Sequence, residues 1–161
     1  MRFAKGHGTE NDFVILVDPA GDRGLSPGLA ARLCDRRAGI GADGVLRAVR
    51  TEALAGGPGP GPAGGGSETA AAPNGSGPGS PAGPAPEWFM DYRNHDGSTA
   101  EMCGNGIRVF ARYLADRGLV TGPAFTVATR SGSRRVRLEE DGNVAAEMGA
   151  VTVLGPGRAG R

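Results

Sequence analysis

Apolar residues form two kinds of pattern along this chain, short runs and a helical spacing, and each pattern predicts a different kind of element. Short runs rich in β-branched and aromatic residues, bounded by turn residues, predict strands. These runs cover 13–17, 45–49, 88–92, 125–129, 134–138 and 143–148. Ser131-Gly132-Ser133 and Asp141-Gly142 separate the last three runs, so hairpin turns are predicted there.

The longest helical pattern covers 105–117. Its apolar positions have the i, i+3, i+4, i+7 spacing of one helix face. They are Ile107, Phe110, Ala111 and Leu114. Gly118 follows where a C-terminal cap is expected. Other faces of this helix are apolar too, so we expect it to be buried with strands wrapped around it.

A shorter helix is predicted over 29–35. Ser26 is a good N-cap, and Pro27 suits the first helical position. Two helices combined with six or seven strands favour the α+β class. We therefore expect a β-rich roll or barrel around a central helix.

A low-complexity stretch, 55–86, interrupts these patterns. It contains 11 Gly, 8 Pro and 7 Ala, and Glu68 is its only charged residue. Such a segment buries too little apolar surface to offset its ordering entropy, which predicts a disordered insertion. We expect 1–54 and 87–154 to form one domain, followed by a tail over 155–161. A linker between two domains is the weaker alternative, because 54 residues would make a poor core alone.

Charge and hydropathy exclude several classes of function. The 161 residues include 18 Lys and Arg against 17 Asp and Glu, a net charge of +1, which gives no electrostatic case for nucleic acid or an anionic membrane surface. The longest early apolar run, 13–17, is too short for a signal peptide or a spanning helix. We therefore expect a cytoplasmic protein in which Cys34 and Cys103 are free thiols, although a disulfide stays possible.

Residues 39–44, GIGADG, match the dinucleotide-binding pattern G-x-G-x-x-G. We reject that interpretation because the match follows a predicted helix and leads into a predicted strand, the reverse of the required order. A tight turn explains these glycines better.

The strongest candidate chemistry lies at the start of the long predicted helix. Cys103 stands at its threshold, followed by Gly104 and Gly106, which leave backbone N–H groups open. A helix N-terminus favours negative charge, so it stabilises a thiolate and can hold a substrate carboxylate. Spacing alone is equally compatible with a catalytic thiolate and with a small buried cysteine at a turn.

Three ordered blocks resemble the N-terminal half of the diaminopimelate epimerase family. They are KGHGTENDF (5–13), CDRRAGIGADG (34–44) and NHDGSTAEMCGNGIR (94–108). This family contains pyridoxal-phosphate-independent amino-acid epimerases of the last steps towards lysine and peptidoglycan precursors. The resemblance implies a two-lobed fold, each lobe a β-rich roll around a helix, with the active site between the lobes.

The resemblance also implies a reaction that needs no metal and no cofactor. One cysteine, as thiolate, removes the α-proton of diaminopimelate, and a second cysteine, as thiol, protonates the opposite face, which interconverts the LL and meso forms. Carried over by position, Cys103 is similar to the catalytic cysteine of the first half. Asn11 and Asn94 are similar to side chains that hold the substrate's amino-acid groups, and Gly104 and Asn105 to the donors at the helix start.

Other positions depart from the family or favour a structural role. Glu10 stands where the family commonly has a small or apolar residue, and Gly44 has no side chain where some relatives contribute one. Cys34 lies on the shorter predicted helix and is expected to pack in the core. Four arginines near the last strands are expected to form a solvated face. They are Arg130, Arg134, Arg135 and Arg137.

The chain ends at Arg161, where the family's second half is expected to begin. We expect the second catalytic cysteine to come from a missing C-terminal half or a second subunit, and this chain alone to have little epimerase activity. Two alternatives stay open. One is another cofactor-independent amino-acid racemase or epimerase of the same superfamily, and the other is a non-catalytic half-domain that acts through association.

Overall fold

Seven strands form one curled sheet in the computed structural model, which describes residues 2–56 and 85–148. The strands lie in the sheet in chain order. They are β1 (Ala4–Gly8), β2 (Asn11–Val17), β3 (Gly44–Arg50), β4 (Trp88–Asn94), β5 (Ala124–Thr129), β6 (Gly132–Leu138) and β7 (Val144–Ala146). The helices of the described residues are α1 (Pro27–Cys34), α2 (Thr51–Gly56) and α3 (Gly104–Asp116). The predicted α+β class is confirmed.

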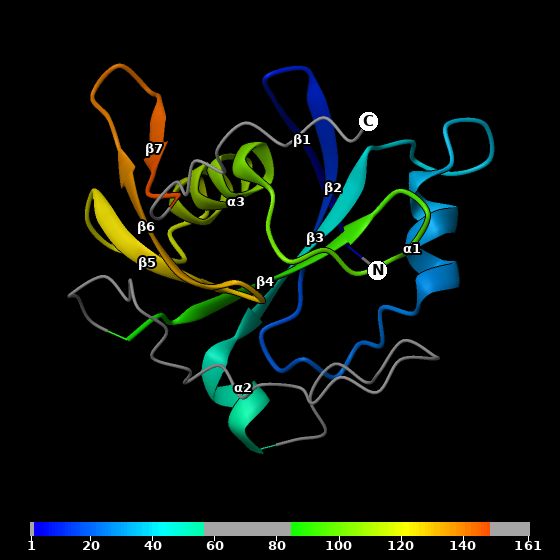
Figure 1. The fold of residues 1–161 in the computed structure, drawn as a ribbon, viewed down its shortest axis with the longest axis horizontal. Helices are drawn as coiled ribbons and strands as arrows, with labels where there is room; N and C mark the ends of the chain where they lie inside the picture. The colour runs from blue at the N-terminus through cyan, green and yellow to red at the C-terminus, as the bar shows by residue number, and fades with distance from the viewer. Residues whose placement is uncertain (1, 57–84, 149–161) are drawn as a thin grey trace, which may run out of the picture.

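The sheet is covered on both faces by helices (Figure 1). Helix α3 lies inside the curve of the sheet, as its apolar faces predicted, and α1 lies against the other face. Strand β2 shows why its apolar run is unbroken: Phe13 and Ile15 pack towards α3, while Val14 and Leu16 pack towards α1. A strand that is buried on both faces needs apolar residues at every position.

The predicted capping residues are found at the start of α1 and at the end of α3. The Ser26 side chain accepts a hydrogen bond from the Leu29 N–H at 3.2 Å, which starts α1 at Pro27, two residues before the predicted start. At the end of α3, Gly118 has φ +64°, and its N–H donates to the Ala115 carbonyl at 2.9 Å. The Leu119 N–H donates to the Leu114 carbonyl, which completes a Schellman motif.

Strand β1 packs unusually close to α3. A Cβ atom at Gly6 would lie 2.9 Å from a Val109 methyl group, and one at Gly8 would lie 2.7 Å from the other methyl group. Any side chain at these positions would push the helix away from the sheet. Strand β1 was not predicted, because AKGHG has no apolar alternation. Helix α2 was not predicted either, and its last two residues fall within the expected insertion.

The predicted strands are confirmed, with small shifts at their ends. The last strand is shorter than expected, since β7 covers only Val144–Ala146. The turn between β5 and β6 lies one residue earlier than 131–133, because Thr129 pairs with Gly132 in the ladder. Residues 57–84 of the expected insertion and the expected tail over 155–161 lie outside the described residues. In the part of the chain that is described, no helix is long and apolar enough to cross a membrane.

The expected solvated face is wrong for two of its four arginines. Arg135 and Arg137 are exposed, but Arg130 and Arg134 are half-buried. The Arg130 guanidinium pairs with Asp91, whose side chain is fully buried, and it also donates to the Tyr92 carbonyl at 3.2 Å. Sequence patterning cannot show such a pair, because its two members are 39 residues apart.

Candidate active site at the N-terminus of helix α3

Cys103 is the N-cap residue of α3. Its backbone is extended (φ −135°, ψ 121°), and its Sγ accepts a hydrogen bond from the Gly106 N–H at 3.3 Å. The thiol is free and half-buried. Space is tight at Gly106, because a Cβ at that position would lie 3.2 Å from the Cys103 Cβ and 3.3 Å from Leu46. The sulfur therefore lies against the N–H groups of the helix start, where negative charge is stabilised.

The first turn of α3 meets the start of β2 through two asparagine side chains. Asn105 donates from Nδ2 to Asn11 Oδ1 at 2.7 Å, although the two residues are 94 positions apart. Arg108 holds the other end of the Asn105 amide, since its Nη2 donates to Asn105 Oδ1 at 2.5 Å. Its Nε also donates to the Gly104 carbonyl at 3.1 Å. Arg108 thus clamps the first turn of α3.

Asn11 is held on its other side by Asp43. The Asn11 Nδ2 donates to Asp43 Oδ2 at 3.2 Å, and the Asp12 backbone N–H donates to the same oxygen at 3.0 Å. Arg36 bridges the two carboxylates, with Nη2 at 2.7 Å from Asp12 Oδ1 and 2.8 Å from Asp43 Oδ1. Hydrogen bonding from Arg36, helped by Lys5 at 3.0 Å, holds the pKa of Asp12 well below its usual range.

The turn that precedes Asn11 is strained. Thr9 and Glu10 form the two-residue loop between β1 and β2, and both have positive φ, 52° and 66°. Such hairpin loops favour Asn and Gly, because a Cβ is unfavourable in the left-handed region. Glu10 is unfavourable at this position, but the hairpin still forms, because Gly8 and Asn11 are paired across it.

Tyr92 is a neighbour of Cys103 that the sequence analysis treated only as part of a strand. Its side chain is 8% exposed. Burial raises the pKa of Tyr92 to about 12, and negative charge at Cys103 and Asp43, together with a hydrogen bond to Cys103, adds to the rise. A Cβ at Gly44 would lie 2.6 Å from the Tyr92 ring, so the space near position 44 is filled by this ring. The available signal was a phenol in an apolar strand, because a buried hydroxyl requires a polar partner.

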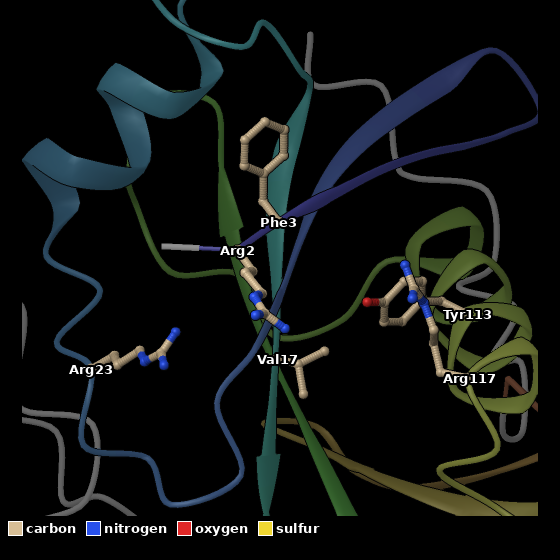
Figure 2. Close-up of a pocket in the computed structure, with 6 residues that line it drawn as sticks. All are labelled: Arg2, Phe3, Val17, Arg23, Tyr113 and Arg117. Carbon is tan, nitrogen blue, oxygen red and sulfur yellow. The ribbon is translucent and has the colours of Figure 1, made fainter.

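One hollow of the structure lies apart from this site. A hollow of about 890 Å³ is lined by residues before β1, at the end of β2 and at the C-terminal end of α3, opposite to Cys103 (Figure 2). Among residues 2–56 and 85–148, no group of three His, Cys, Asp or Glu side chains could hold a metal ion. Cys34, the last residue of α1, is buried between this helix and the sheet. Burial raises the pKa of its thiol, which agrees with the predicted packing role.

Comparison with known proteins gives one consistent family. The family model for diaminopimelate epimerase matches residues 83–154. Diaminopimelate epimerase of Thermobifida fusca is 58% identical over 99% of this chain and 52% of its own length. The Streptomyces coelicolor enzyme is 50% identical over 92% of this chain and 44% of its own length. Over nearly its whole length, the chain is similar to diaminopimelate epimerases.

The chain spans about half the length of the curated relatives it matches. Among solved structures, a Bacillus anthracis phenazine biosynthesis protein of the PhzF family is similar over 89% of this chain and 37% of that chain. It is 15% identical with a TM-score of 0.44, which is too weak to bear on function.

Four of the five predicted site residues lie together in the structure. Cys103, Gly104 and Asn105 start α3, and Asn11 contacts them through Asn105. Asn94 ends β4, where its Nδ2 donates to Ser98 Oγ at 3.0 Å. Among the described residues, no hydrogen bond joins Asn94 to the other four. Strand alternation nevertheless places it on the same face of β4 as Tyr92, the neighbour of Cys103.

Proposed function

We propose that this chain supplies one half of the active site of a diaminopimelate epimerase, in which Cys103 acts on the α-carbon of diaminopimelate. The observation that carries the proposal is the position of the sulfur. Cys103 caps α3, accepts the Gly106 N–H at 3.3 Å, and lies where the helix N-terminus stabilises a thiolate.

In the proposed reaction, the Cys103 thiolate takes the α-proton and becomes a thiol. The electron pair of the broken C–H bond is delocalised into the substrate carboxylate, whose negative charge the open N–H groups of Gly104 and Asn105 stabilise. A second thiol on the opposite face gives up its proton to the α-carbon and becomes a thiolate. The result is inversion, and the LL and meso forms interconvert.

The second thiol is not expected to be Cys34. That residue ends α1 and is buried between this helix and the sheet, on the face opposite to α3, and it is the only other cysteine of the sequence. We therefore expect the donor to come from a further segment or a second subunit. Asn11 and Asn94 are assigned to the substrate's amino-acid groups, and we place the reaction in the cytosol, where thiols stay reduced.

Exchange of the α-proton tests this proposal. The protein as encoded is incubated with LL- and meso-diaminopimelate in D₂O under reducing conditions, and deuterium incorporation and stereochemistry are followed. Cys103→Ala is expected to lower the exchange rate on the order of 10³-fold, in the range for loss of a general base. Cys34→Ala is the matched control and is expected to keep the rate, with only lower stability.

The outcomes separate the possibilities. Exchange with inversion that depends on Cys103 supports a complete two-base enzyme, and exchange without inversion supports a half-site that lacks its donor. Exchange that persists in Cys103→Ala would contradict the assignment of the base. Activity on another amino acid, but not on diaminopimelate, would favour a different epimerase of the same superfamily.

A further inference from the structure

The hydrogen bonds around Asn11 run in one direction. An ionised carboxylate accepts hydrogen bonds and donates none. Asp43 therefore requires the Nδ2 group of Asn11 on its side, at 3.2 Å, which turns the Asn11 oxygen towards α3. Asn105 must then present its own Nδ2 to that oxygen, at 2.7 Å.

The far end of this chain of bonds is consistent with the same direction. The Asn105 oxygen accepts from Arg108, which has only donors. Two asparagine amides, each of which could rotate by half a turn at little steric cost, are thus oriented between a pure acceptor and a pure donor. The order is Asp43, Asn11, Asn105 and Arg108.

Asp43 itself is held from several sides. Its Oδ2 accepts the Asp12 N–H at 3.0 Å, and its own N–H donates to the Asp12 carbonyl at 2.9 Å. Its Oδ1 accepts from Arg36 at 2.8 Å. Arg36 in turn binds the Asp12 carboxylate through both Nη atoms, at 2.7 and 3.1 Å. The carboxylate is therefore a fixed reference for the amide of Asn11.

We infer that Asp43 is a positioning residue, which orients the Asn11 and Asn105 amides so that both offer N–H donors to a substrate carboxylate. This inference rests on the proposed function. Each amide uses one of its two Nδ2 hydrogens in the bonds above, and no other partner of these groups lies among the described residues. Free N–H donors beside a helix N-terminus suit an anion, whereas a rotated amide would turn oxygen lone pairs towards it.

Asp43→Asn tests the inference in the protein as encoded. Asparagine cannot accept on both sides, because one of its two terminal atoms is a donor. It meets either Arg36 or Asn11 with the wrong group. We expect KM for diaminopimelate to rise about 10-fold to 100-fold, the loss of one charge-assisted hydrogen bond, while kcat changes less. Asp116→Asn is the matched control, since among the described residues the ion-pair partner of Asp116 is the exposed Arg112.

A double-variant comparison separates positioning from a purely structural role. If Asp43 acts through Asn11, Asp43→Asn has little further effect on KM once Asn11 is Ala. If Asp43 only clamps the β1–β2 hairpin, its effect is the same in both backgrounds, and the inference is overturned. Should Asp43→Asn fail to fold, Arg36→Gln removes one anchor of Asp43 and is expected to raise KM in the same direction by a smaller factor.

A readout without substrate keeps this inference distinct from the proposed function. The side-chain amide signals of Asn11 and Asn105 are assigned by NMR from their alanine variants. Asp43→Asn is expected to shift both pairs of signals and to speed their hydrogen exchange, whereas Asp116→Asn leaves them in place. Unchanged signals in a folded Asp43→Asn protein would overturn the positioning role. If Asp43→Asn shows these shifts but the unmodified protein does not react with diaminopimelate, the positioning role stands and the proposed function is overturned.

Discussion

Tyr92 and Cys103 share their surroundings, and each should report on the other. The phenol of Tyr92 is buried at the end of β4, and Phe13 meets its ring edge-on at a centroid distance of 6.2 Å. Burial is the largest cause of its raised pKa, and charge at Cys103 is the next. When Tyr92 loses its proton, the phenolate adds a negative charge next to the charge at Cys103.

The Tyr92 pKa gives a test of this juxtaposition that needs no substrate. The native phenol is expected to titrate near pH 12, above the ordinary value of 10.0. Because the folded state holds this proton more tightly, its stabilising contribution is complete below pH 10 and is lost as the pH rises towards 12. Absorbance of the phenolate, read within milliseconds of an alkaline pH jump in a Tyr113→Phe background, measures it. Cys103→Ala should lower this pKa, and an unchanged value would mean that the two groups do not interact.

At the scale of elements, the approach of β1 to α3 decides where Asn105 lies. Gly8→Ala would place a methyl group 2.7 Å from Val109 and 3.8 Å from the Asn105 carbonyl. We expect the helix to shift and the free energy of unfolding to fall by about 1–3 kcal/mol, as for other overpacked sites. Val109→Ala removes the clash, so the double variant should lose less stability than the sum of the two single variants. Urea denaturation measures all three, and simple additivity would show that the contact is not the cause.

Prediction of the elements from the sequence succeeded where burial leaves a local pattern. The apolar run at 13–17 and the helical apolar pattern at 105–117 can each be recognised within one short segment of sequence, and both elements are present in the structure. Strand β1 has no such pattern in its own sequence. It forms because it pairs with β2 and packs closely against α3.

The candidate site shows the same limit more sharply. Cys103 was identifiable from local signals, since a cysteine followed by glycines marks a helix start. Asp43 was not, because its role appears only when the chain brings it to Asn11, 32 residues away. Tyr92 likewise looks like an ordinary strand residue until the fold places it beside Cys103. Local chemistry thus indicated Cys103 as the candidate, while the groups around it depend on the tertiary fold.

At the scale of the whole molecule, a buried cluster of charges joins strands β1 to β4 of the sheet to strands β5 to β7. Strands β4 and β5 share only two ladder pairs, Trp88 with Val127 and Phe89 with Ala128. Beyond them, Asp91 continues the connection. It pairs with Arg47 on β3 at 3.2 Å, with Arg93 on its own strand at 3.2 Å, and with Arg130 from the β5–β6 turn.

Asp91→Asn should therefore destabilise the entire fold. The substitution keeps the shape but removes the carboxylate that pairs with the buried Arg93 among the described residues, and it leaves Arg47 with Asp18 as its remaining partner. Breaking a buried ion pair in this way typically costs about 3–5 kcal/mol. Arg130→Gln should cost less, about 1–2 kcal/mol, because its side chain is 22% exposed and water replaces part of the lost interaction. Urea denaturation of both variants and of their combination measures the coupling.

The same cluster links stability to the site. Arg130 also holds the Tyr92 carbonyl at 3.2 Å, at the end of β4 that leads to Asn94. If the β5–β6 hairpin supports that strand end, Arg130→Gln should lower the native Tyr92 pKa, because a looser strand end admits water to the phenol, and it should also raise KM for diaminopimelate. Loss of stability with neither change would mean that the cluster holds the sheet together without any influence on the residues around Cys103.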